Sequence, residues 1–238
     1  MRKAISISLL FCSTFLSTEA AELGIFGGVA LYSGDLSPRA FGLYFENSAP
    51  AIGGFGRLYL APWLSTRLSV NTGRLEIEDA DRERRLDFRS KLTEFNVMAE
   101  LSPLHILRGY RGAFSPYLFA GLGFFRFETE GQLDGEWYLL QPLGTEGQGL
   151  PGYDDPYNVT EVSFPIGIGL RIELSEHIIL GLELGGRKLF TDYIDDIGDT
   201  QVNYRELYEG NGPIAAQLSN RQIDPNGETD ITYIRGGS

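Results

Sequence analysis

The chain has 238 residues, a formal net charge of −12 and a single cysteine, Cys12. This acidity argues against nucleic-acid binding, which needs a basic surface to neutralise phosphates. One cysteine excludes an internal disulfide, and the spacing of histidine, cysteine and carboxylate residues fits no zinc site.

The N-terminus has the pattern of an export signal. Arg2 and Lys3 precede an apolar run, residues 4–16, that is too short to cross a bilayer as a helix. Residues 18–20 then offer small side chains at the positions that a signal peptidase reads. We therefore expect residues 1–20 to be a signal peptide and residues 21–238 to form one outer-membrane β-barrel domain.

Period-two alternation dominates the rest of the chain. In residues 164–174, the apolar set that includes Ile166 and Ile168 alternates with a set that includes Gly169 and Arg171. In a strand these two sets point to opposite faces. Seven segments read as strands, at approximately residues 23–32, 51–60, 64–75, 88–101, 115–128, 164–174 and 177–190.

The connections between these strands alternate in length. Tight turns follow the second and sixth strands, and the connection at residues 102–114 is intermediate. Long or strongly charged segments follow the other strands, at residues 33–50, 76–87, 129–161 and from 191 onward. This alternation is typical of outer-membrane barrels, whose long loops lie outside the cell and whose short turns lie in the periplasm.

The polarity of the two faces distinguishes a membrane barrel from a soluble, lipocalin-like one. One face is almost purely aliphatic and aromatic, as lipid requires, and the other combines glycine with charges of both signs. We therefore predict an all-β fold, a small antiparallel transmembrane barrel of the eight-stranded type with an OmpA-like meander and a plugged lumen. The predicted lumen charges are Arg57, Glu94, Glu100, Arg126, Arg171, Glu173, Glu183 and Arg187.

Seven strands are an odd number, whereas bacterial single-chain barrels have an even one. Either the last strand is missing from this chain, which we expect, or residues 201–233 contain a strand without a clear pattern. An open edge in lipid would be costly because its backbone groups would lack partners.

Little in the chain suggests catalysis or a cofactor. Residues 147–152, GQGLPG, match the dinucleotide pattern G-x-G-x-x-G, but no helix is expected after them, so we predict a loop. An enzyme at the outer rim would normally need a histidine there, and His105 and His177 both fall beside short connections. The acidic residues from Asp192 to Asp199 lack calcium-loop spacing, which favours a solvated loop. We expect no cofactor and no metal.

Residues 135–149, GEWYLLQPLGTEGQG, closely resemble a loop motif of the PorG-like family of outer-membrane barrels, which is associated with the type IX secretion system. Residues 32–36, 115–121 and 188–196 also resemble segments of that family. The resemblance implies a non-enzymatic role in protein secretion and contact with a periplasmic ring, formed by a lipoprotein and its partner subunit.

The motif loops have two possible roles, which the sequence leaves open. They either contact a partner or cap the barrel, with Trp137, Tyr138 and Pro142 folded back over the lumen. The candidate residues are Gly34, Asp35, Glu136, Trp137, Tyr138, Gln141, Pro142, Gly144, Glu146, Gly147, Thr191, Asp192, Tyr193, Asp195 and Asp196. On the barrel wall, we expect Ile168→Arg to be more harmful than Gly169→Ser.

Overall fold

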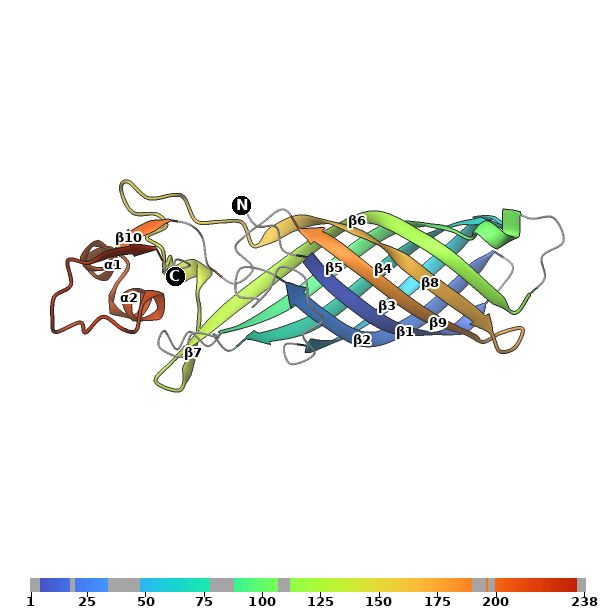
Figure 1. The fold of residues 1–238 in the computed structure, drawn as a ribbon, viewed down its shortest axis with the longest axis horizontal. Helices are drawn as coiled ribbons and strands as arrows, with labels where there is room; N and C mark the ends of the chain where they lie inside the picture. Colours follow the sequence, from blue (N-terminus) through green and yellow to red (C-terminus); the bar gives the residue numbers. More distant parts are fainter. Residues whose placement is uncertain are drawn as a thin grey trace.

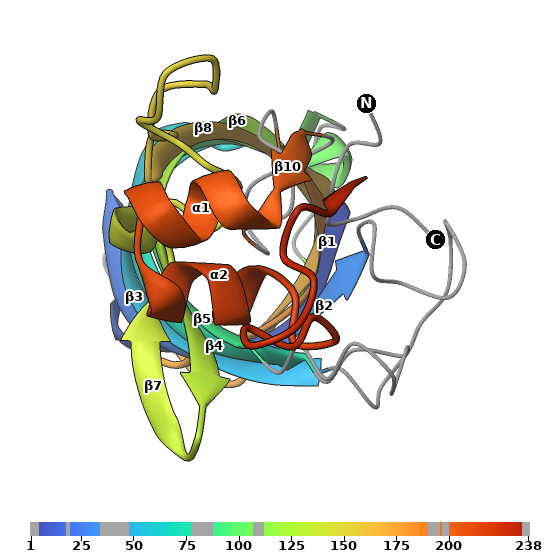
Figure 2. The same ribbon diagram turned by 90° about the vertical axis from the view of Figure 1, so that its left-hand side faces the viewer.

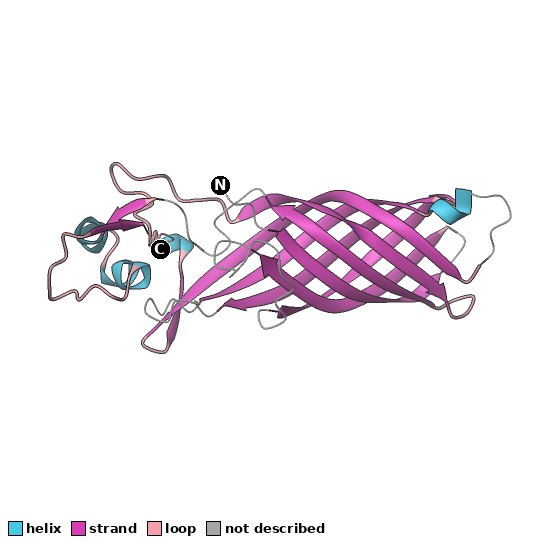
Figure 3. Cartoon of the chain, viewed as in Figure 1, coloured by secondary structure: helices cyan, strands magenta, loops and turns pink. Residues whose placement is uncertain are grey.

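The computed structural model describes residues 5–17, 20–33, 48–77, 88–106, 112–189, 196 and 200–234. Strands dominate these residues (Figure 3). The strands of the main sheet are β1 (Ile5–Ser17), β2 (Ala21–Ser33), β3 (Ser48–Ala61), β4 (Leu64–Ile77), β5 (Phe88–Leu101), β6 (Phe114–Leu133), β7 (Glu136–Leu139), β8 (Thr160–Glu173) and β9 (Ile179–Leu189).

The main sheet closes into a barrel (Figure 1). Its strand order is β5-β4-β3-β2-β1-β9-β8-β6-β7, and an additional pairing between β5 and β6 completes a ring of eight strands. Every neighbouring pair in the ring is antiparallel. β7 pairs only with β6, outside the ring. The predicted fold class, a small antiparallel barrel of the eight-stranded type, is confirmed.

The eighth place in the ring is taken by β1. This strand lies within the segment that we expect to be the signal peptide, and it pairs with β2 on one side and β9 on the other. Residues 201–233 do not supply the closing strand. They contain β10 (Gln201–Asn203), α1 (Tyr204–Gly210), α2 (Pro213–Ser219) and most of β11 (Thr232–Ile234), and β10 and β11 form a separate two-stranded sheet.

The two faces of the barrel wall have the predicted polarity. On β8, Ile166 and Ile168 are 56% and 54% exposed on the outside, whereas Arg171 on the inner face is only 6% exposed. This arrangement reverses that of a soluble barrel, where charges face water and apolar side chains fill the interior. It is the arrangement that a transmembrane barrel requires.

The two ends of the barrel carry connections of different length and structure. The connections between β3 and β4 and between β8 and β9 are short, and they lie at the same end as the 3₁₀ helix Pro103–Ile106, called η2 (Figure 1). We call this the turn end. The opposite, loop end carries the β6–β7 hairpin and residues 201–234. None of the helices in the described part of the chain is long and apolar enough to cross a bilayer.

The hairpin at the loop end begins where β6 outgrows the ring. Asp134 and Gly135 connect β6 to β7 with positive φ angles of 51° and 86°. Two consecutive positive φ angles are typical of the type I′ turn, for which Asp-Gly is a favoured pair. Part of the segment expected to be a long loop is therefore regular structure.

Candidate functional site

A buried ionic network fills the lumen nearer the turn end, with Glu100 at its centre. The carboxylate of Glu100 accepts hydrogen bonds from Arg57 Nε at 2.6 Å and from Arg171 Nη2 at 2.7 Å. The Nε of Arg67 lies 2.9 Å from its other oxygen. Ser65 donates a further hydrogen bond at 3.0 Å. Three arginines from three strands thus converge on one carboxylate.

Two further glutamates complete the network. Glu22 accepts hydrogen bonds from Arg57 and Tyr59, and Glu183 accepts from Arg67 and Tyr117. The three arginines are therefore matched by three carboxylates. Because an unpaired charge in a low-dielectric interior is costly, this matching allows the lumen to be both charged and closed.

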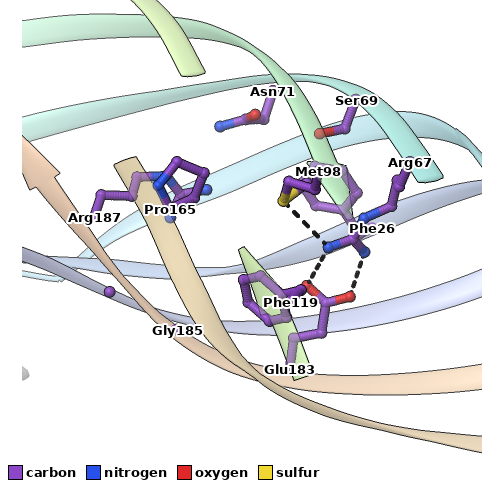
Figure 4. A pocket seen from close by; sticks show the side chains of 11 residues that line it. Phe26, Arg67, Ser69, Asn71, Met98, Phe119, Pro165, Glu183, Gly185 and Arg187 are labelled. Carbon is purple, nitrogen blue, oxygen red and sulfur yellow. Dashed lines mark hydrogen bonds and ion pairs between the residues drawn. The ribbon is translucent and has the colours of Figure 1, made fainter. Parts of the chain in front are cut away.

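A second polar layer lies nearer the loop end, around Glu94. Its carboxylate accepts from Arg187 Nε and Ser163 Oγ, both at 2.7 Å, and from Asn71 Nδ2 at 3.0 Å. Between the two layers is a cavity of about 20 Å³, with residues such as Arg67, Glu183 and Arg187 in its lining (Figure 4). This volume has room for about one water molecule. The interior is filled by side chains, as the eight-stranded architecture predicts.

Most of the predicted lumen charges lie inside the barrel, and two do not. Arg57, Glu94, Glu100, Arg171 and Glu183 are buried, and Arg187 is half-buried. Arg126 instead lies on the outer face, since Phe125 and Phe127 take the inward positions of β6. Glu173 is exposed because it is the last residue of β8, at the open turn end.

Five members of the network were not predicted from the sequence: Glu22, Tyr59, Ser65, Arg67 and Tyr117. A signal for Arg67 was present. Ser65, Arg67 and Ser69 alternate with larger or apolar residues on β4, and Arg67 lies directly opposite Arg57 in the register. Glu22 and Tyr117 lie in or next to glycine-rich strands, where alternation is weak.

An apolar cluster closes the loop end of the lumen. Phe125 and Phe127 on β6 pack with Leu189 on β9, and Leu92 and Tyr157 pack against them. The rings of Phe127 and Tyr157 are stacked, with centroids 6.0 Å apart. Tyr157 also donates a hydrogen bond to Asp196 Oδ1 at 2.6 Å. We call this cluster the aromatic plug.

Residues 143–153, which we call the motif segment, form a folded scaffold, and the part from Gly144 to Gln148 is buried. Thr145 and Glu146 are almost fully buried, and the Thr145 hydroxyl donates to Asp196. Gly147 has a φ of +83°, and a Cβ there would come within 2.4 Å of the Tyr153 ring. The glycines therefore serve tight turns and close packing. Residues after Gly152 continue as turn and extended backbone, so the segment lacks the strand–turn–helix context of a dinucleotide site.

Residues 201–234, which we call the C-terminal module, form their own apolar core. Fully buried Tyr204, Leu207 and Ala216 contribute to it, and Leu143 of the motif segment packs against it. Burial raises the pKa of the Tyr204 hydroxyl. The module lies beyond the loop end of the barrel, in line with its axis (Figures 1 and 2).

Hydrogen bonds join the module to the motif segment. Asn211 Nδ2 donates to the Gly144 carbonyl at 2.8 Å. Tyr153 donates to Glu206 at 2.7 Å and accepts from the backbone N–H of Asn203 at 3.1 Å. Because these contacts connect residues fifty or more positions apart, motif and module pack as one unit.

A cap of Trp137, Tyr138 and Pro142 over the lumen, one of the two roles that the sequence left open, is not what the structure contains. The β6–β7 hairpin projects to the side of the barrel (Figures 1 and 2). Trp137 packs on Arg89, whose guanidinium lies 4.1 Å from the ring centroid, and Pro142 is exposed. The aromatic plug occupies the lumen instead, because Phe125 and Phe127 point inward.

The remaining motif candidates that the structure describes range from exposed to buried. Glu136 is exposed and accepts a hydrogen bond from Tyr138 at 2.7 Å. Gln141 is half-buried and donates to the Tyr157 carbonyl at 3.2 Å, while Gly144, Glu146, Gly147 and Asp196 are buried. The candidates outside the described residues are Gly34, Asp35, Thr191, Asp192, Tyr193 and Asp195.

Solved structures of small outer-membrane proteins are similar to this chain. The attachment invasion locus protein Ail of Yersinia pestis is 12% identical, with a TM-score of 0.32, over 80% of this chain and 100% of its own. The outer membrane protein OprG of Pseudomonas aeruginosa is 11% identical, with a TM-score of 0.35, over 79% and 96%. Neisserial surface protein A is 13% identical, with a TM-score of 0.33, over 80% and 98%.

No curated protein matches the chain. A family model does match, over residues 1–215, and its description is "Domain of unknown function (DUF6089)". Since this match covers most of the chain, the protein belongs to the DUF6089 family.

Proposed function

We propose that this protein is a non-enzymatic barrel of the bacterial outer membrane that acts through protein contacts, as a component of the type IX protein secretion apparatus. The observation that carries the proposal is the combination of a closed, charge-matched lumen with an apolar outer wall. A barrel of this kind is held in lipid, and because the described side chains fill its lumen, it works through its surfaces.

The outer wall supports the membrane location. Large apolar side chains are about half exposed on every well-described strand of the wall, among them Ile25, Ile52, Val70, Phe95, Leu122, Ile168 and Leu184. Such a continuous apolar surface would aggregate in water. In lipid it is the expected outer surface of a barrel, since lipid and lumen positions alternate along each strand.

The filled lumen argues against a wide channel. The ionic network around Glu100 and the aromatic plug occupy successive levels of the interior. Planar-bilayer recording of the full-length protein tests this directly. We expect no large, stable, porin-like conductance, and such a conductance would refute a closed barrel and favour the alternative of a solute channel.

The secretion role is supported by the resemblance of residues 135–149 to a PorG-like loop motif. Within the motif, Gly144, Thr145 and Gly147 are buried in a scaffold and are poor contact residues. At the turn end, by contrast, Trp63, Ile106 and Phe114 are 40%, 56% and 58% exposed. With the turn end in the periplasm, these side chains face the proposed secretion ring, formed by a lipoprotein and its partner subunit.

Affinity purification of the tagged full-length protein in mild detergent tests this partner. We expect the secretion-ring subunits to copurify with the wild type and to be lost with Ile106→Asp at the turn end. Ile231→Asp is the matched control, because Ile231 is an exposed isoleucine in the C-terminal module. Absence of ring subunits from the wild-type sample, or intact type IX secretion in a deletion strain, would contradict the proposal.

Two alternatives predict different outcomes. A general small barrel, whether structural or a small-solute channel, would copurify with no secretion subunit. An enzyme at the outer rim would need reactive groups at the loop end. His105 lies in η2 and His177 in the β8–β9 connection, and both of these elements are at the turn end (Figure 1). This placement favours the non-enzymatic role.

A further inference from the structure

The outer face of β4, β5 and β6 changes character sharply toward the loop end. Side chains directly opposite one another form rows across these strands. The lowest of three successive rows is apolar and consists of Val70, Phe95 and Phe124. The next consists of Thr72, Thr93 and Arg126. The uppermost row consists of Arg74, Lys91 and Glu128.

The uppermost row contains two cations that form no ion pair with the described side chains. Arg126 is neutralised by Glu128, with Nη2 and Oε1 3.2 Å apart. Arg74 lies directly opposite Lys91, both side chains are exposed, and neither forms an ion pair within the described part of the chain. Like charges directly opposite each other on neighbouring strands are destabilising. A bound anion would remove this repulsion.

Carboxylates lie in the same row and in the next. Glu128 lies opposite Lys91 and pairs with Arg126, and one row nearer the loop end Arg89 lies opposite Glu76 and pairs with Glu130. Arg74 and Lys91 thus differ from the lumen arginines Arg57, Arg67 and Arg171, each of which reaches a carboxylate. This pair of cations lies at the border between the apolar wall and the loop end.

An apolar groove runs up to this cationic pair. It has a volume of about 850 Å³, and its lining includes Ile25, Ile52, Val70, Thr93 and Lys91. Gly27 also lines it, and the nearest described atom to a Cβ there is the Ala51 carbonyl oxygen, at 4.0 Å. A groove with an apolar wall and a cationic end matches an acyl chain that ends in a phosphate.

We propose that Arg74 and Lys91 bind the phosphate of a phosphorylated membrane lipid in the leaflet at the loop end, with one acyl chain of that lipid in the groove. The site requires a barrel that spans the membrane. It does not require a secretion partner, so a failed copurification of ring subunits would leave it intact.

Native mass spectrometry of the full-length protein, released from detergent with added diphosphoryl lipid A, measures this binding. A basic residue near an anionic lipid surface contributes about 1 kcal/mol, or about fivefold. We therefore expect the double variant Arg74→Gln/Lys91→Gln to bind about 30-fold more weakly. The control Lys188→Gln/Arg205→Gln removes two exposed cations elsewhere and should bind like the wild type.

Two further arms distinguish the source of the phosphate and the role of the groove. Dephosphorylated lipid A should bind the wild type and the double variant with the same affinity. Millimolar inorganic phosphate should compete poorly with lipid A, because it lacks the acyl chain. Gly27→Leu fills the groove and should weaken lipid A binding while the cations remain. Equal binding of phosphorylated and dephosphorylated lipid by the wild type, or full displacement by inorganic phosphate, would overturn the proposal even if the double variant failed to fold.

Discussion

The lumen and the C-terminal module solve opposite packing problems within one chain. In the lumen, Glu100 and its arginines are fully buried and held by ion pairs, while the apolar side chains of the same strands face outward. In the module, Tyr204 and Leu207 are buried and the charged residues Glu206 and Glu209 are exposed. The barrel interior is polar because its exterior is lipid, whereas the module surrounds an ordinary core because its exterior is water.

This difference indicates that the stability of the lumen is sensitive to the loss of a charge, whereas the stability of the module is sensitive to the loss of side-chain volume. In the lumen each charge depends on an opposite charge, so single substitutions leave a partner uncompensated. In the module the energy is spread over apolar contacts, and a truncation leaves a cavity.

The largest expected effect is in the lumen. Glu100→Gln keeps the shape of the side chain but removes the charge that faces Arg57, Arg67 and Arg171. Breaking a buried pair in this way costs about 3–5 kcal/mol in the free energy of unfolding. Urea unfolding from lipid vesicles measures it. Glu128→Gln, on the exposed outer face, is the control and should change stability by less than about 1 kcal/mol; equal effects would remove the contrast.

A truncation in the module should have a smaller and local effect. Leu207 is fully buried in the module core, and Leu207→Ala should cost about 2–5 kcal/mol there. Hydrogen exchange should become faster across residues 201–234 and in the motif segment, while amides of β4 and β5 remain protected. Tyr208→Ala, at a position 39% exposed, should change little. Faster exchange throughout the barrel would show that the two regions are not separable.

A charge on the lipid face tests the other side of the wall. Ile168→Arg should cost about 2–4 kcal/mol and reduce insertion, measured as the fraction of heat-modifiable protein on gels. The sequence suggested Gly169→Ser as a mild control, but a Cβ at Gly169 would lie 2.3 Å from the Tyr117 ring. Gly54→Ser is the better control, since the nearest atom to its Cβ is the Gly24 carbonyl oxygen at 3.7 Å.

The smallest expected effect is at the start of α1. The Asn203 side chain caps this helix by accepting a hydrogen bond from the Glu206 N–H at 3.2 Å. Asn203→Ala should cost about 1 kcal/mol, measured as a change in hydrogen exchange of α1 alone. Asn226→Ala, in an exposed turn of the same module, is the comparison; a larger effect there would rule out the cap as the cause.

The sequence predicted the barrel well because its faces follow a simple period. Strand ends from Leu64 to Leu101 agree within about two residues with the predicted segments, and the outward position of Ile168 follows from alternation alone. Alternation failed at Arg126 because glycines before it, at 121 and 123, hide which parity faces inward.

The module was not predicted because its signals are short and its contacts are distant. α1 and α2 have seven residues each, which is too few for a clear helical period. The burial of Thr145 depends on Asp196, and that of Leu143 on Ala216 and its neighbours. Local patterning contains no information about such distant pairs. The motif therefore resembled a family segment in sequence, but its role as a packed scaffold could not be predicted.

Spin-label accessibility tests the central claim, that the apolar face of the wall lies in lipid, most directly. In a Cys12→Ser background, nitroxide labels at Ile168→Cys and Val70→Cys should collide strongly with oxygen and weakly with a water-soluble nickel chelate, and a label at Ile231→Cys should show the reverse. Strong nickel accessibility at Ile168 and Val70 in reconstituted protein would place that face in water and contradict the account.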